Sequence, residues 1–166
     1  IEVGEININK LKSLNHPIAR IRAVHTGGNE ASKADSDVAK GLESQILLAR
    51  GARVMLRANL CVEAGLVNGA IGTVHDILFE ENQRPPFLPI AVFVEFDAYN
   101  GSAIVSTESK RTILIPSIRC SWDTNVETCT HLQIPLSLAW AIMVYKSQGL
   151  TLANAMINLG NKEYAS

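Results

Sequence analysis

Residues 51–74 read GARVMLRANLCVEAGLVNGAIGTV, and this stretch decides how the middle of the chain is interpreted. Both of its ends are rich in β-branched and aliphatic residues, as strands are. Between them, Asn68-Gly69 is the strongest turn signal in the chain, because both residues tolerate a positive φ. The stretch therefore predicts a strand, a loop, and a hairpin turn that leads into a second strand.

Short runs of the same kind follow at residues 72–79, 90–96 and 111–118. Three prolines lie between the first two runs, and proline cannot donate a hydrogen bond in the interior of a ladder. Residues 80–89, which contain Pro85, Pro86 and Pro89, are therefore predicted to form a loop. Regularly spaced short strands of this kind predict a small antiparallel barrel or sandwich.

The residues before this β-rich middle have a different pattern. Residues 4–15 fit a short helix loosely, through Ile6, Ile8, Leu11 and Leu14. Pro17 would end that helix, and the alternation in 18–26 predicts a strand. A polar, turn-rich stretch then leads into a possible short helix at 42–48.

The pattern changes again after Pro135. Residues 136–148 contain no helix breaker and predict a largely buried helix, which Gly149 is well placed to end. Residues 154–160 predict a buried strand. A helix followed by a buried strand is typical of an α/β layer, so the β-rich middle is interpreted as an insertion between two pieces of an α/β domain.

Composition narrows the possible functions. The chain has 166 residues, 47% of them hydrophobic, and a net charge of −1, which argues against a strongly basic nucleic-acid module. Residues 1–60 are net positive and residues 61–166 net negative, a pattern that a solvated face explains better than a nucleic-acid footprint. No apolar run is long enough to span a membrane. The acidic start lacks the apolar core of a signal peptide, and without an initiator Met the chain is expected to be a fragment.

Metal, disulfide and nucleophile patterns are missing from the sequence. Cys61, Cys120 and Cys129 form no C-x-x-C pair, so reduced, intracellular cysteines are expected and no metal site is assigned. The sequence contains no phosphate-binding P-loop, no G-x-S-x-G and no H-E-x-x-H. The chain by itself therefore offers no complete catalytic constellation.

Two groups of polar residues remain as candidates. In Lys146-Ser147-Gln148-Gly149, Lys and Ser can bind phosphate, Gln can bind a base, a ribose or a neighbouring motif, and Gly permits close backbone approach. On chemistry alone, an ordinary helix terminus explains this motif better. Arg53 and Arg57 could project from one face of a strand and follow a phosphate backbone, and a solvated strand face explains them equally well.

Taken together, two long motifs give a specific resemblance. They read GARVML-x-x-NL-x-x-x-x-GLVNGAIGTV and, downstream, LAWA-x-x-x-x-KSQGLTL. PIAVFVEFD, LIPSI, LQIPLSLAWA and INLGNKEYA add to the match. The chain resembles the C-terminal half of petite-integration-frequency (Pif) type DNA helicases, relatives of RecD in helicase superfamily one. The resemblance is good over residues 40–166 and loose over residues 1–39.

The resemblance implies a fold and a set of domains. Such helicases couple ATP hydrolysis to 5′-to-3′ movement along single-stranded DNA and serve in genome maintenance, repair and recombination. The expected fold class is α/β: an incomplete RecA-like domain with an inserted small antiparallel, SH3-like β domain. The expected boundaries are 1–50 for the first part of the second RecA-like domain, 51–133 for the insertion, and 134–166 for the return, which stops before the last motif.

The resemblance also implies roles for individual residues. Lys146 and Ser147 would face DNA phosphates or the adjacent motif, and Gln148 and Gly149 would lie nearer the nucleotide and relay its state. Arg53 and Arg57 are the further candidates for DNA contact. The role of Asn68 and Gly69 is architectural.

Partners and cofactors follow from the same resemblance. ATP and Mg²⁺ would be bound mainly by an N-terminal RecA-like domain that this chain does not contain. Single-stranded DNA is the expected partner, with no membrane. An intracellular location is expected, in the nucleus or the mitochondrion if the source is eukaryotic.

The sequence departs from the family pattern before the KSQG motif. The family has Thr and His where this chain has Met143 and Tyr145. The Thr hydroxyl that is lost could make a neutral hydrogen bond, worth on the order of 1 kcal/mol. Tyr keeps an aromatic face, which could still stack on a base, but carries no charge near neutral pH. The chain also ends before the motif whose Arg would reach the γ-phosphate, so it is expected to be inactive alone.

Two other functions stay open at this point. The chain could be a non-catalytic DNA-binding remnant of a transposon-borne helicase, which would bind single strands weakly and without any effect of ATP. It could also be a protein-interaction or inert structural domain, which would bind no oligonucleotide.

Overall fold

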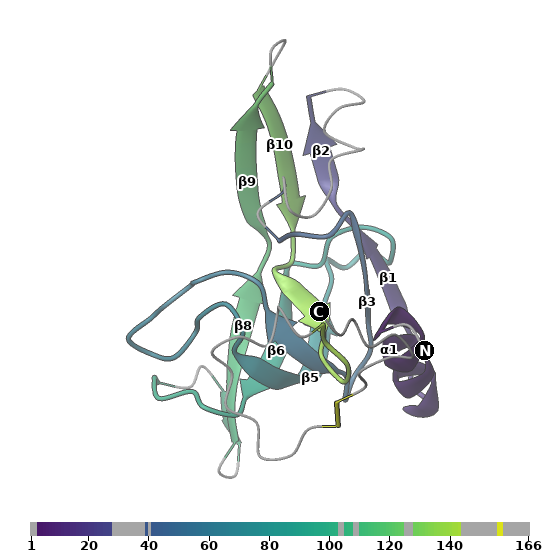
Figure 1. The fold of residues 1–166 in the computed structure, drawn as a ribbon, viewed down its shortest axis with the longest axis vertical. Coiled ribbons are helices and arrows are strands. Elements are labelled where there is room, and N and C mark those ends of the chain that lie inside the picture. Colours follow the sequence, from purple (N-terminus) through teal and green to yellow (C-terminus); the bar gives the residue numbers. More distant parts are fainter. Residues whose placement is uncertain are drawn as a thin grey trace, which may run out of the picture.

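The computed structural model describes residues 3–27, 39, 41–102, 105–107, 110–124, 128–143 and 156–157. Within them the chain forms one helix, α1 (Val3–Ser13), and eleven strands. Figure 1 shows a body built around a six-stranded sheet, with α1 at its side, and a narrower three-stranded sheet that projects from this body. A separate two-stranded sheet packs near α1.

The six-stranded sheet has the order β11-β4-β5-β6-β8-β7, and each neighbouring pair is antiparallel. Its strands are β4 (Arg53–Leu56), β5 (Ile71–Leu78), β6 (Ala91–Phe96), β7 (Val105–Thr107), β8 (Lys110–Pro116) and β11 (Leu136–Leu138). The strands predicted at 72–79, 90–96 and 111–118 are thus confirmed, as is their antiparallel arrangement. The predicted loop at 80–89 is confirmed too.

The hydrophobic core of the body joins this sheet to α1 and to the two-stranded sheet of β1 (Ala19–Arg22) and β3 (Gln45–Leu48). Alternate residues of the central strands point into it, which is the period that a half-buried strand requires. The fully or almost fully buried members include Leu11, Ile21, Leu48, Val54, Leu56, Val92, Val94, Ile115, Ile134 and Leu136. One continuous core therefore contains residues from all three of the predicted segments 1–50, 51–133 and 134–166.

The helix predicted at 42–48 is wrong, because residues 45–48 form β3. This strand pairs antiparallel with β1, in the register Ala19↔Leu48 to Arg22↔Gln45. Its alternate residues Ile46 and Leu48 are buried. Short apolar runs fit both a helix and a strand, and here pairing with β1 decides the conformation.

The buried helix predicted from residue 136 is also wrong where the structure describes it. Residues 136–138 form β11, an edge strand that pairs with β4 in the register Leu136↔Leu56 to Leu138↔Val54. The ladder continues on both sides, because Arg57 donates its backbone N–H to the Pro135 carbonyl at 2.8 Å and Ala139 donates to the Arg53 carbonyl at 2.9 Å. The free edge of β4 thus captures the segment as a strand.

The buried strand predicted at 154–160 is not seen at the two residues of it that the structure describes. Met156 and Ile157 lie outside any strand, and their exposed fractions are 100% and 70%. No described element packs against them, so their apolar side chains gain nothing from burial. The other residues of the stretch lie outside the described part of the chain.

The projecting sheet has the order β2-β10-β9 and is built from β2 (Val24–Thr26), β9 (Ile118–Asp123) and β10 (Thr128–Gln133). The strand predicted at 18–26 is confirmed as two strands, β1 and β2, that belong to different sheets. The hairpin of β9 and β10 was not predicted. It begins directly after β8 and returns directly to β11, so it extends the body upwards in Figure 1.

Close packing of β2 on β10 requires Gly27. Its φ is +102°, and a Cβ at this position would lie 2.8 Å from both the Cα and the Sγ of Cys129. Only glycine tolerates both the backbone conformation and the approach. Beside it, Thr26 and Thr130 hydrogen-bond each other through their hydroxyl groups across the two strands.

Candidate functional site

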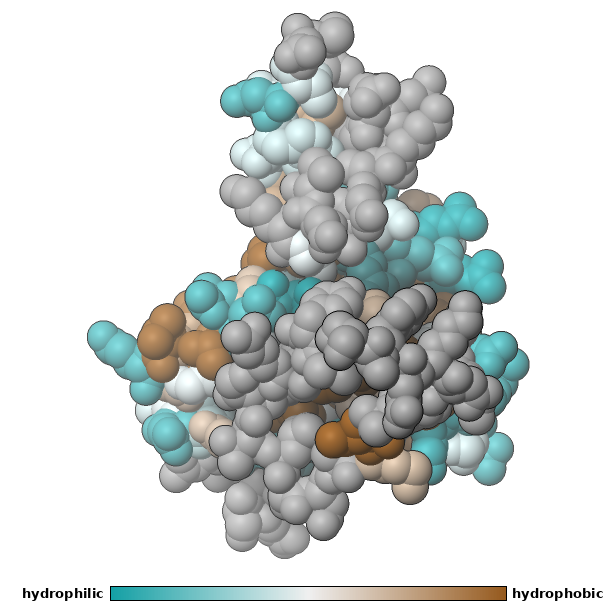
Figure 2. All heavy atoms as spheres, viewed as in Figure 1, coloured by the Kyte–Doolittle hydropathy of each residue, from teal (hydrophilic) through white to brown (hydrophobic). Residues whose placement is uncertain are grey.

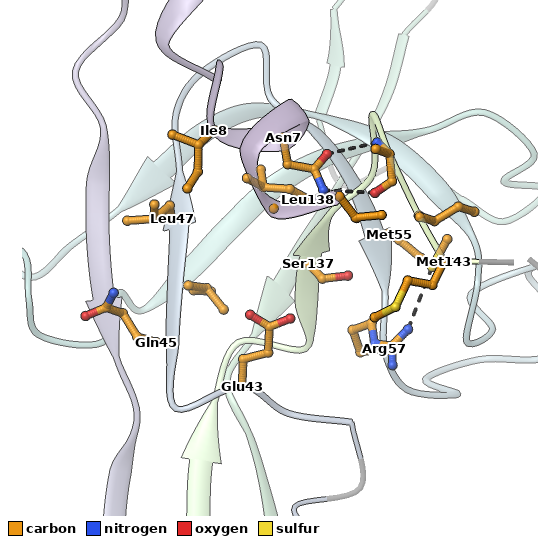
Figure 3. Close-up of a pocket in the computed structure, with 15 residues that line it drawn as sticks. Asn7, Ile8, Glu43, Gln45, Leu47, Met55, Arg57, Ser137, Leu138 and Met143 are labelled. Carbon is orange, nitrogen blue, oxygen red and sulfur yellow. Dashed lines mark hydrogen bonds between the residues drawn. The ribbon is translucent and has the colours of Figure 1, made fainter. Parts of the chain in front are cut away.

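A cavity of about 300 Å³ lies where α1, β3, β4 and the residues after β11 meet. It matters because its wall includes Ser137, Leu138 and residues 141–143, and Lys146-Ser147-Gln148-Gly149 begins three positions after Met143 in the sequence. Figure 3 shows side chains from all four elements pointing towards one another around this space. Most of the lining is apolar, and the polar groups are few: Asn7, Glu43, Gln45, Arg57 and Ser137.

Asn7 forms the α1 side of the cavity and is 7% exposed. Its side-chain Nδ2 donates to the Ala141 carbonyl at 2.8 Å, and its Oδ1 accepts the Ala141 N–H at 2.9 Å. Leu11 lies one turn later on the same face of α1 and is fully buried. The helix predicted at 4–15 is thus confirmed, but its core-facing residues are Asn7 and Leu11, whereas Ile8 is 39% exposed.

Arg57 forms the opposite wall, directly after β4. Its Nη1 lies 3.8 Å from the Met55 sulfur, a weak acceptor, and its Nη2 lies over the backbone of Gly41. Among the residues that the structure describes, no carboxylate forms an ion pair with Arg57. Its positive charge is therefore available to a ligand at the edge of the cavity.

Arg53 lies in a different environment, although it shares a strand face with Met55 through the two-residue period of β4. Its guanidinium donates to both carboxylate oxygens of Asp97, through Nη1 at 2.9 Å and through Nη2. Nη1 also donates to Thr73 Oγ1 at 3.0 Å. The hydrogen bond and charge of Asp97 raise the pKa of Arg53, against the opposing effect of burial. Its charge is already neutralised within the sheet.

Asn68 and Gly69 are the central residues of a turn, which the Ala70 N–H closes by donating to the Val67 carbonyl at 2.9 Å. Gly69 has a φ of +96°, and the Asn68 N–H is bound by the Asn59 side chain at 2.8 Å. This turn is not the tip of a short hairpin. Residues 57–70 make an excursion between β4 and β5, whose base is closed by Leu56 N–H to Ala70 O and Gly69 N–H to Leu56 O, both at 2.8 Å.

The other candidates lie outside the described residues: Tyr145, Lys146, Ser147, Gln148 and Gly149. Met143, which replaces the family's threonine, is described. It lines the cavity and is 44% exposed. The described part of the site thus brings Arg57 and Met143 together, and leaves Arg53 engaged with Asp97.

Two features of the site escaped sequence reasoning, Asn7 and Glu43. The signal for Asn7 is its position four residues before Leu11, but a search for apolar periodicity passes over a polar residue on the buried face. Glu43 reaches the cavity with its side chain (Figure 3), while its backbone carbonyl receives Gln133 Nε2 at 3.1 Å and contacts His131 Nε2 at 3.3 Å. Nothing in the local sequence around Glu43 predicts these contacts.

The described residues include no cluster of three or more His, Cys, Asp or Glu side chains that could hold a metal ion. In the same part of the chain, no helix combines the length and the apolar character needed to cross a bilayer.

The sequence is similar to those of ATP-dependent DNA helicases over almost all of its length. The ATP-dependent DNA helicase PIF1 of Homo sapiens is 34% identical over 159 residues, which are 96% of this chain and 22% of that protein. The ATP-dependent DNA helicase PIF7 of Trypanosoma brucei brucei is 29% identical over 175 residues, which are 95% of this chain and 17% of that protein. The chain thus spans about a fifth of the length of these relatives. No protein-family model matches it.

Solved structures give the same result for the fold. Pif1 helicase from Candida albicans matches with a TM-score of 0.66 over 90% of this chain and 35% of that chain, at 22% identity. Bacteroides Pif1 bound to single-stranded DNA matches with a TM-score of 0.56, and Bacteroides Pif1 in complex with ADP-AlF4 with 0.57. Each of these two covers 90% of this chain and 30% of the other, at 26% identity.

These neighbours define the class: the sheet-rich fold fits part of a RecA-like helicase domain. The sequence relatives narrow the class further, since they share the segment that carries the Asn68-Gly69 turn and the cavity wall. Over the segment that it shares with them, the chain belongs to the family of Pif1-type DNA helicases.

Proposed function

We propose that this chain is the part of an ATP-dependent 5′-to-3′ DNA helicase that contacts single-stranded DNA and relays this contact to a nucleotide site. One observation carries the proposal: Arg57, which has no ion-pair partner among the described residues, lines a cavity together with Met143, and Lys146-Ser147-Gln148-Gly149 begins three positions later in the sequence. A cation beside a Lys-Ser motif is an arrangement suited to phosphate groups. The relatives' names and the DNA-bound Bacteroides neighbour support the choice of DNA.

The proposal assigns roles by position. Lys146 and Ser147 contact DNA phosphates, Tyr145 stacks on a base, and Gln148 and Gly149 relay the state of the nucleotide. Of the two arginines, we assign Arg57 rather than Arg53 as the additional cation that contacts DNA phosphates. Arg53 could reach DNA only by giving up two hydrogen bonds to Asp97 and one to Thr73.

The proposed domain boundaries are the ones predicted from the sequence. Residues 1–50 and 134–166 belong to the second RecA-like domain, and 51–133 form a small SH3-like insertion, within which the Asn68-Gly69 turn is architectural. The antiparallel order of β4, β5, β6 and β8 supports a β-rich insertion. The shared hydrophobic core indicates that the insertion is packed firmly on its host.

A further RecA-like domain would supply most of the site for ATP and Mg²⁺. The sequence contains no P-loop, and this supports the division. The ADP-AlF4 complex of the Bacteroides neighbour supports a nucleotide cofactor. The proposed context is genome maintenance, repair and recombination, in the nucleus or the mitochondrion if the source is eukaryotic.

The first test measures single-stranded DNA binding by the full-length protein that contains this chain. Arg57→Gln removes the charge but keeps a hydrogen-bonding side chain. We expect the Kd to rise about tenfold at low salt, the typical effect of one charged hydrogen bond. The slope of log K against log salt should fall by about 0.7, the value for one phosphate contact on a single strand.

Arg50→Gln is the matched control. Arg50 is exposed, whereas Arg57 is half-buried. Arg50 pairs with Asp76 at 2.8 Å beside a different cavity, so its loss should leave the Kd unchanged. An equal loss of affinity in both variants would contradict a specific role for Arg57. If the unmodified protein binds single strands but hydrolyses no ATP in their presence, it is a DNA-binding remnant of a transposon-borne helicase. If it binds no oligonucleotide, the DNA proposal is wrong.

A further inference from the structure

Asn7 does more than fill a place on α1, because its carboxamide reproduces the hydrogen bonding of a neighbouring strand. It donates to the Ala141 carbonyl and accepts from the Ala141 N–H, at 2.8 and 2.9 Å. Figure 3 shows both bonds spanning the cavity from α1 to the chain that follows β11. A side chain with only a donor or only an acceptor could not make this pair.

Among the described residues, Ala141 is the last before the KSQG motif whose backbone is hydrogen-bonded to another segment. The ladder between β11 and β4 ends at the bond from Ala139 N–H to Arg53 O, 2.9 Å long. Beyond Ala141, the backbones of Ile142 and Met143 make no hydrogen bond to another described residue. Asn7 therefore fixes the point from which the chain departs, five positions before Lys146.

Helix docking does not by itself require Asn7. Leu11 is fully buried and holds α1 against the core through apolar contact. A buried carboxamide is unfavourable unless it is fully hydrogen-bonded, so an apolar residue would serve the docking of α1 equally well. The advantage of Asn at position 7 is that it fixes the backbone of Ala141.

We propose that Asn7 is a positioning residue for Lys146-Ser147-Gln148-Gly149: it ties α1 to the backbone that presents this motif, so that the response of ATP turnover to DNA depends on it. The inference rests on the proposed helicase function. Asn7 itself touches neither DNA nor nucleotide in this scheme. It acts through Ala141, and its loss should uncouple DNA contact from ATP turnover without removing either.

The test compares Asn7→Ala, Asn7→Asp and Leu11→Ala in the full-length protein that contains this chain. ATP turnover is measured without DNA and with saturating single-stranded DNA, below the melting temperature of each variant. For Asn7→Ala we expect the DNA-stimulated kcat to fall about tenfold, because losing two hydrogen bonds of ordinary strength changes a rate by about this factor. ATP turnover without DNA should stay within about twofold of that of the unmodified protein. Asn7→Asp keeps the shape but loses the donor, and should be equally impaired.

Leu11→Ala is the structural control. It should lower the melting temperature more than Asn7→Ala does, yet retain DNA stimulation. A second measurement does not depend on activity: backbone amides of residues 139–143 should exchange with deuterium faster in Asn7→Ala and unchanged in Leu11→Ala.

The outcomes separate two failures. If the unmodified protein shows no DNA-stimulated ATP turnover, the helicase function fails and the role of Asn7 in it fails as well. If stimulation is present but Asn7→Ala keeps it, or if Asn7→Ala and Leu11→Ala both lose it in proportion to their melting temperatures, the positioning role is wrong and the helicase function stands.

Discussion

The six-stranded sheet buries aliphatic side chains against α1 and the β1-β3 pair, whereas the three-stranded sheet β2-β10-β9 combines buried polar and sulfur-containing side chains with a small apolar cluster. In the first, the core consists mostly of Leu, Ile and Val from seven strands and one helix. In the second, His131 and Gln133 are completely buried, and Cys120 and Cys129 lie on the same face of the sheet. Figure 2 shows no large apolar area on the coloured part of the projecting sheet, whereas brown areas occur over the body.

The polar interior of the projecting sheet is held by hydrogen bonds to the covering segment around residues 39–43. Cys120 Sγ donates to the Ala39 carbonyl at 3.3 Å, and Gln133 Nε2 donates to the Glu43 carbonyl. The rings of His25 and His131 pack edge to face, with their centroids 4.6 Å apart. Neither Nδ1 has a hydrogen-bond partner among the described residues. The body is thus stabilised mainly by its buried apolar surface area. The projecting sheet depends more on a few buried hydrogen bonds and on the protonation state of its buried histidine.

The strongest test of this difference is Leu136→Ala in the body. Leu136 on β11 is 1% exposed, so truncation should lower the free energy of unfolding by about 3 kcal/mol, through lost burial and a cavity. Urea denaturation measures it. Leu78→Ala on β5 is the control: Leu78 is 42% exposed, and its truncation should cost less than about 0.5 kcal/mol. Equal effects would show that β11 is no part of the core.

Gln133→Leu tests the projecting sheet. It keeps the volume but removes the donor to Glu43 and the acceptor of the Ile134 N–H, which is bound at 2.9 Å. Buried groups that lose their partners should cost about 2 kcal/mol in the free energy of unfolding.

Gln45→Leu provides the comparison, since Gln45 is exposed on β3. If Gln133→Leu leaves the free energy of unfolding unchanged or raises it, the polar interior does not stabilise the projecting sheet. Apolar burial would then stabilise both sheets.

The smallest expected effect is on pH dependence. Burial of the imidazole, and then the neighbouring His25, lower the pKa of His131, against a smaller opposing effect of its bond to the Glu43 carbonyl. Below about pH 6.5, the ordinary pKa of histidine, the unfolded chain binds a proton that the folded chain refuses. The contribution of His131 to the free energy of unfolding is therefore fully present above that pH. It declines as the pH falls towards the pKa of His131 in the folded state.

Unfolding free energies at pH 7.5 and pH 5.5 check this effect. The decline should be shallower in His131→Gln than in the unmodified protein, because the carboxylates that contribute to acid sensitivity are the same in both. An equally steep decline in the two proteins would remove His131 as a cause.

Sequence patterns predicted the strands whose partners are close in the chain and whose alternation is aliphatic, such as β5, β6 and β8. They failed at β3 and β11, where a short apolar run fits either a helix or a strand. What decides these two is a partner far away in sequence: β1 for β3, and β4 for β11. A single sequence does not contain that information in local form.

The β9-β10 hairpin was missed for another reason. Its inward positions carry Cys120 and Trp122 on β9, and Cys129, His131 and Gln133 on β10. The alternation is present, but Trp122 is the one large apolar side chain among these residues, so apolar periodicity does not detect it. Asn7 escaped for the same reason, and the KSQG motif was found only because of its resemblance to a family.

The excursion of residues 57–70 between β4 and β5 has a practical consequence for spectroscopy. It closes on itself at Leu56 and Ala70, and Cys61 is paired with Leu66 across a short bridge near its far end. Of the chain's three cysteines, Cys61 is exposed and the other two are buried. A thiol-reactive fluorophore should therefore attach at one position of the native protein, in the excursion between β4 and β5. Such a label would report motion of the body without any engineered cysteine.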